Sequence, residues 1–280
     1  MKKRAVLIIL IILAGIICYP IIFLLSGSFM SGVELTESLK PLFYQQTDAY
    51  ISMGLMPVFP TLRHYVEVLL DSPEFFVMFW NSVKLVVAIL ALQLVVGVPA
   101  AWGFAKYSFP FKKTLFTIYI VLMMMPFQVT MLSNYLVLDK LNLINTHLAV
   151  ILPLGFSTFP VFLMYRFFCN IPDDMLEAAK IDGAGILQIF RHIAVPIGSA
   201  GIIAAMILGF LEYWNLIEQP MTFLADQTKW PLSLYLPNIT RETAGSAFAA
   251  SMIGLVPAIL VFTAGQDYLE KGIMASAVKE

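Results

Sequence analysis

The chain has 280 residues, of which 60% are hydrophobic and only 12% are charged, whereas soluble domains carry about 25% charged residues. The 17 Lys and Arg residues nearly balance the 18 Asp and Glu residues, so the composition offers no basic surface for nucleic acid. The mean hydropathy of +0.85 indicates an integral membrane protein.

Six stretches are apolar and long enough to cross a bilayer core as helices, which takes about 20 residues each. Strand-type alternation does not compete with this pattern, and helices satisfy their own backbone hydrogen bonds in lipid. The sequence therefore predicts an all-α integral membrane protein with six transmembrane helices. The predicted spans are residues 5–25, 75–105, 112–136, 147–169, 196–217 and 247–268.

The N-terminus reads MKKR and continues into the first apolar run, Ala5 to Leu25. A signal peptide also has a basic start, but its apolar core is about 7–15 residues long and a small-residue cleavage site follows it. We therefore favour an uncleaved first span over a cleaved signal peptide. Cys18 and Cys169 lie in or at the end of apolar runs, which favours buried apolar side chains over a disulfide or a metal site.

The Lys and Arg residues fall mostly on one side of the predicted spans. The positive-inside rule then places both termini in the cytoplasm, N-in and C-in. Residues 26–74 and 218–246 become extracytoplasmic segments, and the first of them is net acidic. We divide the chain into residues 1–74, the first helix with its extracytoplasmic segment; residues 75–268, a core transmembrane domain of five helices; and residues 269–280, a cytoplasmic tail.

Two features of the spans predict how they pack. Small residues recur every fourth position at Gly201, Ala205 and Gly209, which allows helix backbones to approach closely in a membrane. Several prolines, among them Pro126, lie within predicted spans, so we expect kinked or locally opened helices there.

Motifs for catalysis are missing from the sequence. There is no G-x-x-x-x-G-K-[ST] loop, so the chain is not expected to bind ATP phosphates by a P-loop. The three histidines are far apart in the sequence and lack metal-ligand spacing. The GFSTF sequence at Gly155 to Phe159 lacks the closing glycine of a nucleophile elbow. A membrane enzyme is therefore the weakest interpretation.

A polar stretch, residues 173–196, interrupts two apolar spans on the predicted cytoplasmic side. Pro172 suits a helix start because the first turn needs no donor there. Asp174 and Glu177 have the D-x-x-E spacing of a capping box. Acidic residues lead this helix, whereas a helix lying on a lipid surface favours Lys and Arg. Such a helix suits docking into another protein better than lying on lipid.

A turn and a second short helix follow in the sequence. Gly183 and Gly185 break the helical pattern and allow a sharp turn. Residues 186–193 resume a short helix before Pro196 opens the next span. The apolar face of this short helix holds Ile186, Ile189, Phe190 and Ile193.

The sequence EAAKIDGA, residues 177–184, with Phe190 and Pro196 downstream, is similar to the EAA motif of ABC importer permeases. FWNSVKL at 79–85 and EYWNLIEQP at 212–220 resemble the carbohydrate branch of that family, and within it the MalG-like type of subunit. The resemblance covers the whole chain, with the outer segment after the first span matched least. The C-terminal tail departs from the family in having fewer glycines.

The resemblance implies the type I fold of ABC importer permeases and a coupling helix near residues 173–190. In this family the coupling helix sits in a groove on an ATP-hydrolysing subunit, whose closure on ATP tilts the spans. Carried onto this chain, the ATPase-coupling residues are Glu177, Ala178, Ala179, Asp182, Gly183, Phe190 and Pro196.

The resemblance also implies what the protein does. It implies a permease subunit in a bacterial inner (cytoplasmic) membrane that imports a sugar or oligosaccharide by alternating access. The implied partners are a second permease, which would form a heterodimer, two ATP-binding subunits and an extracytoplasmic solute-binding protein. ATP and Mg²⁺ would be bound by the ATP-binding subunits, so this chain would need no cofactor and perform no catalysis.

Polar residues within spans are costly and therefore suggest a substrate pathway. Sugars are bound by aromatic faces together with planar polar groups, which draws attention to Trp214 and Asn215. The alternative to a substrate contact is that Lys84 and Glu212 snorkel toward the outer boundary or pair with each other there. The candidate pathway residues are Asn81, Lys84, Gln128, Glu212, Trp214 and Asn215, and Gln93 and Asn134 are further polar residues within spans.

Two other transport functions stay open. A permease of the same superfamily could carry a solute that is not a sugar, although the Trp-Asn…Pro run of 212–220 favours a sugar. A secondary transporter would need an internal repeat and coupling-ion residues at the membrane midplane, and neither is clear in the sequence.

Overall fold

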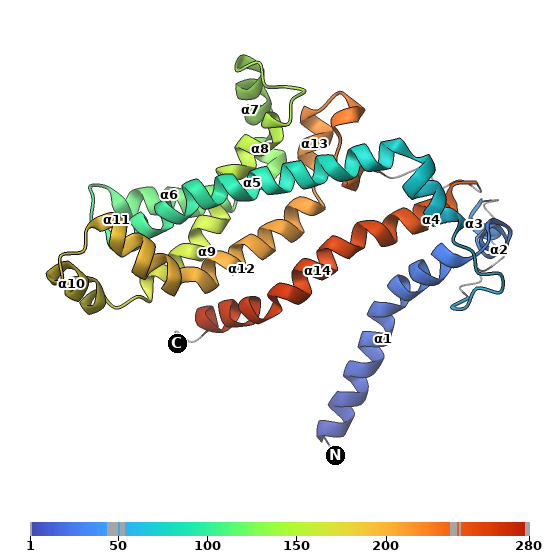
Figure 1. Ribbon diagram of the computed structural model, residues 1–280, viewed down its shortest axis with the longest axis horizontal. Helices are drawn as coiled ribbons and strands as arrows, with labels where there is room; N and C mark the ends of the chain where they lie inside the picture. Colours follow the sequence, from blue (N-terminus) through green and yellow to red (C-terminus); the bar gives the residue numbers. More distant parts are fainter. Residues whose placement is uncertain (1, 44–49, 51–53, 236–239, 241, 278–280) are drawn as a thin grey trace. The chain divides into compact units, whose positions relative to one another are not determined.

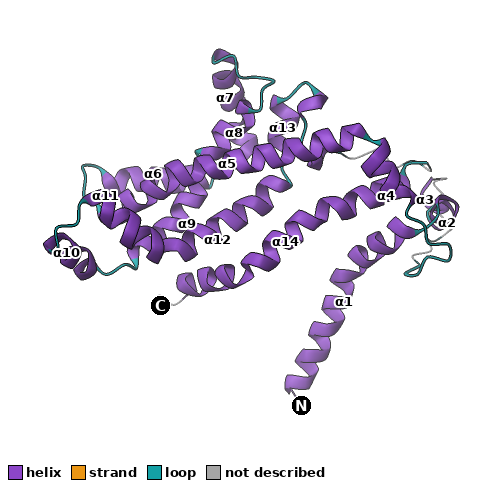
Figure 2. Cartoon of the chain, in the orientation of Figure 1, coloured by secondary structure: helices purple, strands orange, loops and turns teal. Residues whose placement is uncertain are grey.

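The computed structural model describes all residues except 1, 44–49, 51–53, 236–239, 241 and 278–280. The described part of the chain consists of helices joined by loops and turns, without a strand (Figures 1 and 2). The α-helices are α1 (Lys2–Phe29), α2 (Gly32–Ser38), α3 (Lys40–Phe43), α4 (Arg63–Val66), α5 (Pro73–Lys106), α6 (Lys112–Met123), α7 (Phe127–Lys140), α8 (Leu148–Gly155), α9 (Thr158–Cys169), α10 (Asp173–Ile181), α11 (Ile186–Ile189), α12 (Val195–Trp214), α13 (Glu218–Phe223) and α14 (Ala244–Ala277).

The described residues contain the predicted six spans if the third, which is bent, is counted as one span. Five segments are long and apolar enough to cross a membrane, and a sixth is formed if one bent helix pair is counted as a single span. Along α1 the apolar side chains from Val6 to Ile22 are mostly exposed, as expected of a helix that faces lipid. Cys18 is exposed with them, so its predicted burial is wrong. The five segments are Val6–Phe29, Pro73–Lys106, Leu148–Cys169, Ile186–Trp214 and Ala244–Glu270.

The third predicted span, residues 112–136, is not one helix. It is broken into α6 and α7, which are bent by 105° relative to each other. Pro126 forms the N-cap of α7 with an extended backbone (φ −67°, ψ 151°). Because proline lacks a backbone donor and disfavours helix in the residue before it, the helix ends ahead of Pro126 and restarts after it. The predicted kink is therefore confirmed, but as a full break.

The second short helix predicted at 186–193 is not separate from the fifth span. α11 continues through a π-helical turn, Phe190–Ala194, directly into α12, so Ile186 to Trp214 forms one span. The backbone N–H of Val195 donates to the carbonyl of Phe190. A π-turn widens the helix where Pro196 would otherwise clash with the preceding turn. The proline is thus absorbed rather than starting a new helix.

Packing divides the chain into two compact units. The first unit comprises Met1–Phe79 and Tyr235–Pro257, and the second comprises Trp80–Leu234 and Ala258–Glu280. These units are not the predicted segments 1–74, 75–268 and 269–280, which divide the chain by membrane topology and stay a prediction.

The first unit is built around the C-terminal end of α1 and the start of α14. Phe23 packs edge-to-face on Phe248, with ring centroids 5.8 Å apart. Met30 and Leu35 are buried in the same cluster. The C-terminal end of α1 therefore supplies core residues of this unit, while its retention as an uncleaved span stays a prediction.

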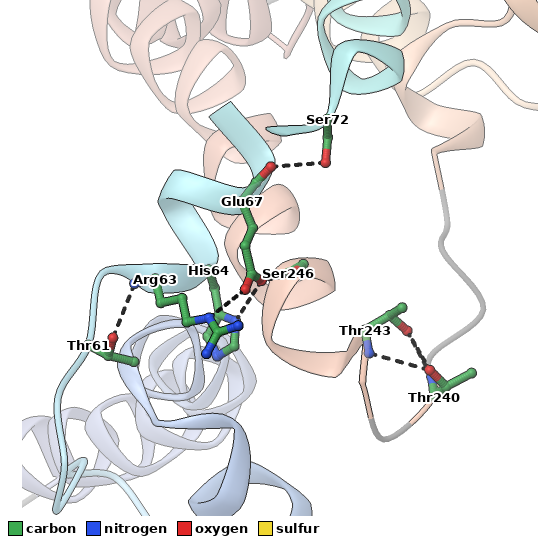
Figure 3. Close-up of polar contacts among 8 residues, drawn as sticks. All are labelled: Thr61, Arg63, His64, Glu67, Ser72, Thr240, Thr243 and Ser246. Carbon is green, nitrogen blue, oxygen red and sulfur yellow. Dashed lines mark hydrogen bonds and ion pairs between the residues drawn. The ribbon is translucent and has the colours of Figure 1, made fainter. Parts of the chain in front are cut away.

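A polar cluster on α4 and the following π-turn (Glu67–Asp71) meets α14 in the first unit (Figure 3). The Glu67 carboxylate accepts hydrogen bonds from Arg63 Nε (2.8 Å) and Ser246 Oγ (2.8 Å) and lies 3.4 Å from His64 Nδ1. Burial acts to raise the pKa of Glu67, but the hydrogen bonds from Ser246, Arg63 and His64 outweigh it, so the pKa lies below its ordinary value of 4.5. A Cβ on Gly245 would lie 2.2 Å from His64 Nε2, so this contact requires glycine.

We expect the Glu67→Gln variant to loosen the segment around residues 63–71. The loss of charge-assisted acceptors costs about 1 kcal/mol, or roughly fivefold faster amide exchange. Because the folded-state pKa is lowered, this contribution is present above pH 4.5 and is lost as the pH falls through the lowered pKa. Hydrogen–deuterium exchange in lipid nanodiscs measures both effects. The exposed Glu74→Gln variant is the control, and equal exchange in both variants would contradict the expectation.

The second unit is built on close contact between α9 and α12, which lie side by side in Figure 1. A Cβ on Gly198 would lie 2.4 Å from the Phe168 ring, and a Cβ on Gly201 would lie 2.3 Å from the Phe167 ring. Glycine at both positions therefore lets the two helices approach. The predicted small-residue row of α12 is confirmed as a buried packing face, since Gly201, Ala205 and Gly209 are all buried.

Candidate functional site

Helix α10 is anchored by two apolar side chains. Leu176 and Ala179 are buried in a core cluster that also contains residues of α5, α9, α11 and α12. Pro172 is the N-cap of this helix, so the predicted capping box of Asp174 and Glu177 is wrong because the helix starts one residue before Asp174. Asp173 and Asp174 lie in the first turn, where the helix dipole favours acids.

The end of α10 is fixed by Gly183. Its φ of 84° lies in the left-handed region, which glycine adopts without strain. The N–H of Gly183 donates to Lys180 O (3.0 Å), and the N–H of Ala184 donates to Ala179 O (2.9 Å). This pair of hydrogen bonds is a Schellman motif. The predicted glycine turn is confirmed, and it turns the chain from α10 into α11.

The outward face of α10 and the turn combines acids with exposed apolar side chains. Glu177, Ala178 and Asp182 are exposed. Ile181 is 86% exposed and Leu187 is 75% exposed. Met175 and Ile186 are exposed as well, whereas Ile189, predicted on the same apolar face as Ile186, is buried. An exposed apolar patch rimmed by polar residues marks a protein-interaction surface. We call the exposed residues from Met175 to Leu187 the α10 surface.

A lysine at the end of α5 holds the start of α10. The Lys106 side chain is only 10% exposed, and its ammonium lies 2.7 Å from Asp173 Oδ1. The same ammonium donates to the carbonyl of Ile171 at 2.6 Å. The hydrogen bond from Lys106 and its positive charge hold the pKa of Asp173 below the ordinary value. Lys106 therefore ties α10 to α5 in addition to the shared apolar core.

The other two predicted coupling residues lie on the far side of α11. Phe190 belongs to the π-turn, and its ring is 6.3 Å from that of Trp102 in α5. Trp102 in turn packs edge-to-face on Phe168 of α9 at 5.5 Å. Pro196 is exposed in the first turn of α12. Aromatic contacts thus join the π-turn to α5 and α9.

A cavity of about 530 Å³ lies in the second unit, between the α6–α7 break, the α8–α9 junction and the end of α12. Its walls include the aromatic rings of Phe127, Phe156 and Phe159. The polar lining residues are Thr130, Asn134, Ser157, Thr158, Glu212 and Gln219. Aromatic rings with amide, hydroxyl and carboxylate groups form the kind of site that binds a small polar molecule. Of the polar span residues named as pathway candidates or further polar residues, Glu212 and Asn134 line this cavity.

The other predicted pathway residues lie elsewhere. Asn81 is buried, and its Nδ2 donates to the carbonyls of Thr228 (2.7 Å) and Trp230 (3.1 Å). Lys84 is exposed, and among the described ion pairs none joins it to Glu212. The amide of Asn81 therefore holds the segment between α13 and α14. This structural contact explains why a polar residue is buried in α5.

Three predicted pathway residues lie near the end of α12 and in α7. Gln128 Nε2 donates to Glu218 Oε1 at 2.5 Å. Trp214 is buried and stacked on Phe210, with centroids 5.5 Å apart. Asn215 Nδ2 donates to Leu211 O at 2.9 Å. These three stay predictions as substrate contacts, and each already has a partner within the chain.

Comparisons with known proteins identify the family. Residues 93–275 match the family described as "Binding-protein-dependent transport system inner membrane component". The chain belongs to this family. It is therefore a component of a transport system in a membrane, and the resemblance seen in its EAA motif is confirmed.

Individual members of the family cover most of the chain. An arabinooligosaccharides transport system permease protein of Halalkalibacterium halodurans is 26% identical over 95% of this chain and 93% of its own. A lactose transport system permease protein of Rhizobium radiobacter is 28% identical over 71% of this chain and 74% of its own. A chain of a bacterial ABC transporter that imports the acidic polysaccharide alginate has a TM-score of 0.79 over 95% of this chain and 96% of its own, at 23% identity. That likeness confirms the predicted permease fold.

Sequence reasoning missed several functional candidates. Lys106 looked like one more charge at the cytoplasmic end of a span, because its partner Asp173 is far away in the sequence. Ser157 and Thr158 were considered only as part of a nucleophile elbow, yet the break between α8 and α9 places both at the cavity. The exposed apolar residues Ile181 and Leu187 carried no signal in a chain this hydrophobic.

Proposed function

We propose that this chain is a permease subunit of an ATP-driven importer that moves a sugar or oligosaccharide across the bacterial cytoplasmic membrane. The observation that carries the proposal is membership of the binding-protein-dependent transport family together with relatives named for arabinooligosaccharide and lactose transport. The cavity beside Glu212 supports a polar solute, since it combines aromatic rings with hydroxyl and amide groups.

The proposal includes the assembly. An external solute-binding protein delivers the sugar, a second permease completes the pathway, and two ATP-binding subunits hydrolyse ATP. ATP and Mg²⁺ bind to those subunits, and this chain performs no covalent chemistry. Both termini lie in the cytoplasm, which places the α10 surface on the side where ATP is available. A structural neighbour, a bacterial alginate ABC transporter in complex with an alginate pentasaccharide-bound periplasmic protein, supports the external partner.

The α10 surface is the proposed joint with an ATP-binding subunit. Glu177, Ala178 and Asp182 face outward beside exposed Ile181, which suits a partner groove that accepts apolar groups and pairs acids. Leu176 and Ala179 root the same helix in a core shared with α5, α9 and α12. A push on α10 is therefore passed to these three spans as a displacement of packed helices, which is the basis of alternating access.

The function is tested by purifying the chain with its co-encoded neighbours in nanodiscs. Binding protein loaded with its sugar is expected to stimulate ATP hydrolysis several-fold and to drive sugar uptake in liposomes. Binding protein without sugar is the control. ATP-independent uptake by the lone chain would instead establish a secondary transporter, and stimulation only by solutes that are not sugars would overturn the sugar class.

A further inference from the structure

The cavity in the second unit has an uneven chemical lining. Its hydroxyl and amide groups, from Thr130, Asn134, Ser157, Thr158 and Gln219, can each donate or accept hydrogen bonds. Glu212 is the one ionisable residue among the described residues that line the cavity. An ionised carboxylate is an acceptor only, so it bonds well to a sugar hydroxyl and poorly to another carboxylate or a phosphate.

The position of Glu212 gives its charge a direct effect on a bound solute. Glu212 lies in the last turn of α12, is an exposed residue and lines the cavity, so a solute in the cavity can reach its side chain. No Lys or Arg is among the described residues that line the cavity. An anionic solute in the cavity would therefore meet like charge without a compensating cation.

We propose that the cavity binds an uncharged saccharide and discriminates against anionic saccharides through the carboxylate of Glu212. The inference rests on the proposed function and narrows its substrate class. The aromatic rings of Phe156 and Phe159 offer apolar faces to the sugar ring, while Glu212 accepts from its hydroxyls. This chain then differs in substrate charge from the structural neighbour that imports the acidic polysaccharide alginate, although the two share a fold.

The test measures direct binding to the assembled permease complex in nanodiscs, without binding protein, by equilibrium dialysis. The probes are matched pairs: galacto- and gluco-oligosaccharides, and the same oligosaccharides with C6 oxidised to a uronate. We expect each neutral member to bind at least about tenfold more tightly than its uronate, a difference of about 1.4 kcal/mol. The Glu212→Gln variant keeps the shape of the side chain and one acceptor oxygen but removes the charge, and it is expected to reduce the ratio to about threefold or less.

The matched control is Glu218→Gln. Glu218 lies outside the cavity lining and accepts from Gln128, so removing its charge is expected to leave the neutral-to-uronate ratio unchanged. A measurement on the unsubstituted complex adds a check that does not depend on folding of a variant. About 0.5 M NaCl screens charge over a few ångströms, and it is expected to strengthen uronate binding while neutral binding stays constant.

The outcomes separate the inference from the proposed function. If neutral sugars and uronates bind equally, if the ratio survives Glu212→Gln, or if salt leaves uronate binding unchanged, the inference is overturned while a sugar permease stands. If saccharides of neither kind bind and sugar-loaded binding protein does not stimulate ATP hydrolysis, the proposed function is overturned and the inference with it.

Discussion

The Gly183→Val variant is expected to lose about nine tenths of the ATP hydrolysis that loaded binding protein stimulates in the complex. A left-handed backbone costs about 1–2 kcal/mol for a residue with a Cβ, and β-branched residues adopt it least readily. Gly183 has φ 84°, and a Cβ there would meet no atom within 4 Å. The effect therefore comes from the backbone alone, which must leave the Schellman turn and redirect the α10 surface.

Gly185→Ala is the matched control for this variant. Gly185 has φ −72°, and its Cβ would meet only Gln188 Oε1 at 3.6 Å, so alanine fits. Stimulated ATP hydrolysis is measured after co-purification establishes that the ATP-binding subunits are retained. A Gly183→Val complex that assembles and hydrolyses ATP at the unsubstituted rate would show that the turn does not serve coupling.

Replacing Lys106 with Met is expected to reduce sugar transported per ATP about fivefold while the ATP-binding subunits stay bound. The substitution keeps the apolar stem and removes the ammonium that bonds to Ile171 O and Asp173. A buried carbonyl that loses its donor costs about 1–3 kcal/mol. Helix α10 then keeps its apolar anchor but loses its link to α5, so its displacement is passed on less completely.

The lysine link is measured by counting transported sugar against phosphate released in liposomes, and by amide exchange at residues 171–176. Lys113→Met, at an exposed position in the first turn of α6, removes an equal charge and serves as control. Because the pKa of Asp173 is lowered from 3.8, the ion pair is complete at neutral pH and is lost only as the pH falls through that lowered pKa. Unchanged coupling in Lys106→Met would show that the apolar core alone transmits the motion.

The sequence alone predicts those parts of the fold that depend on a short, continuous stretch of residues. Apolar runs of about 20 residues locate the spans, and Gly183 marks the turn because one residue type alone suits a positive φ. The EAA motif led to the family. The sequence could not predict the side-chain partners, since Lys106 contacts Asp173 and Asn81 contacts Thr228 across long stretches of chain.

The candidate site shows where prediction from one sequence ends. Polar residues in spans were treated as one class, although the fold uses them in different ways. Gln93 is buried and donates to Tyr213 Oη at 2.7 Å, which joins two spans. Glu212 lies at a cavity. The cost of a polar group in lipid predicts that each will have a partner, but only packing decides whether that partner is protein or solute.

The π-turn at Phe190–Ala194 sets the rotation of α12 about its axis relative to α11, and hence the direction of the cavity side of α12 relative to the α10 surface. It adds one residue to a helix that otherwise advances about 100° per residue. Every side chain of α12, including Glu212, thus takes its azimuth relative to Ile189 from that added residue. The number of residues in the π-turn is therefore as important for the position of Glu212 as the identity of any side chain. A deletion of one residue from the π-turn would leave the EAA motif intact but rotate Glu212 away from the cavity.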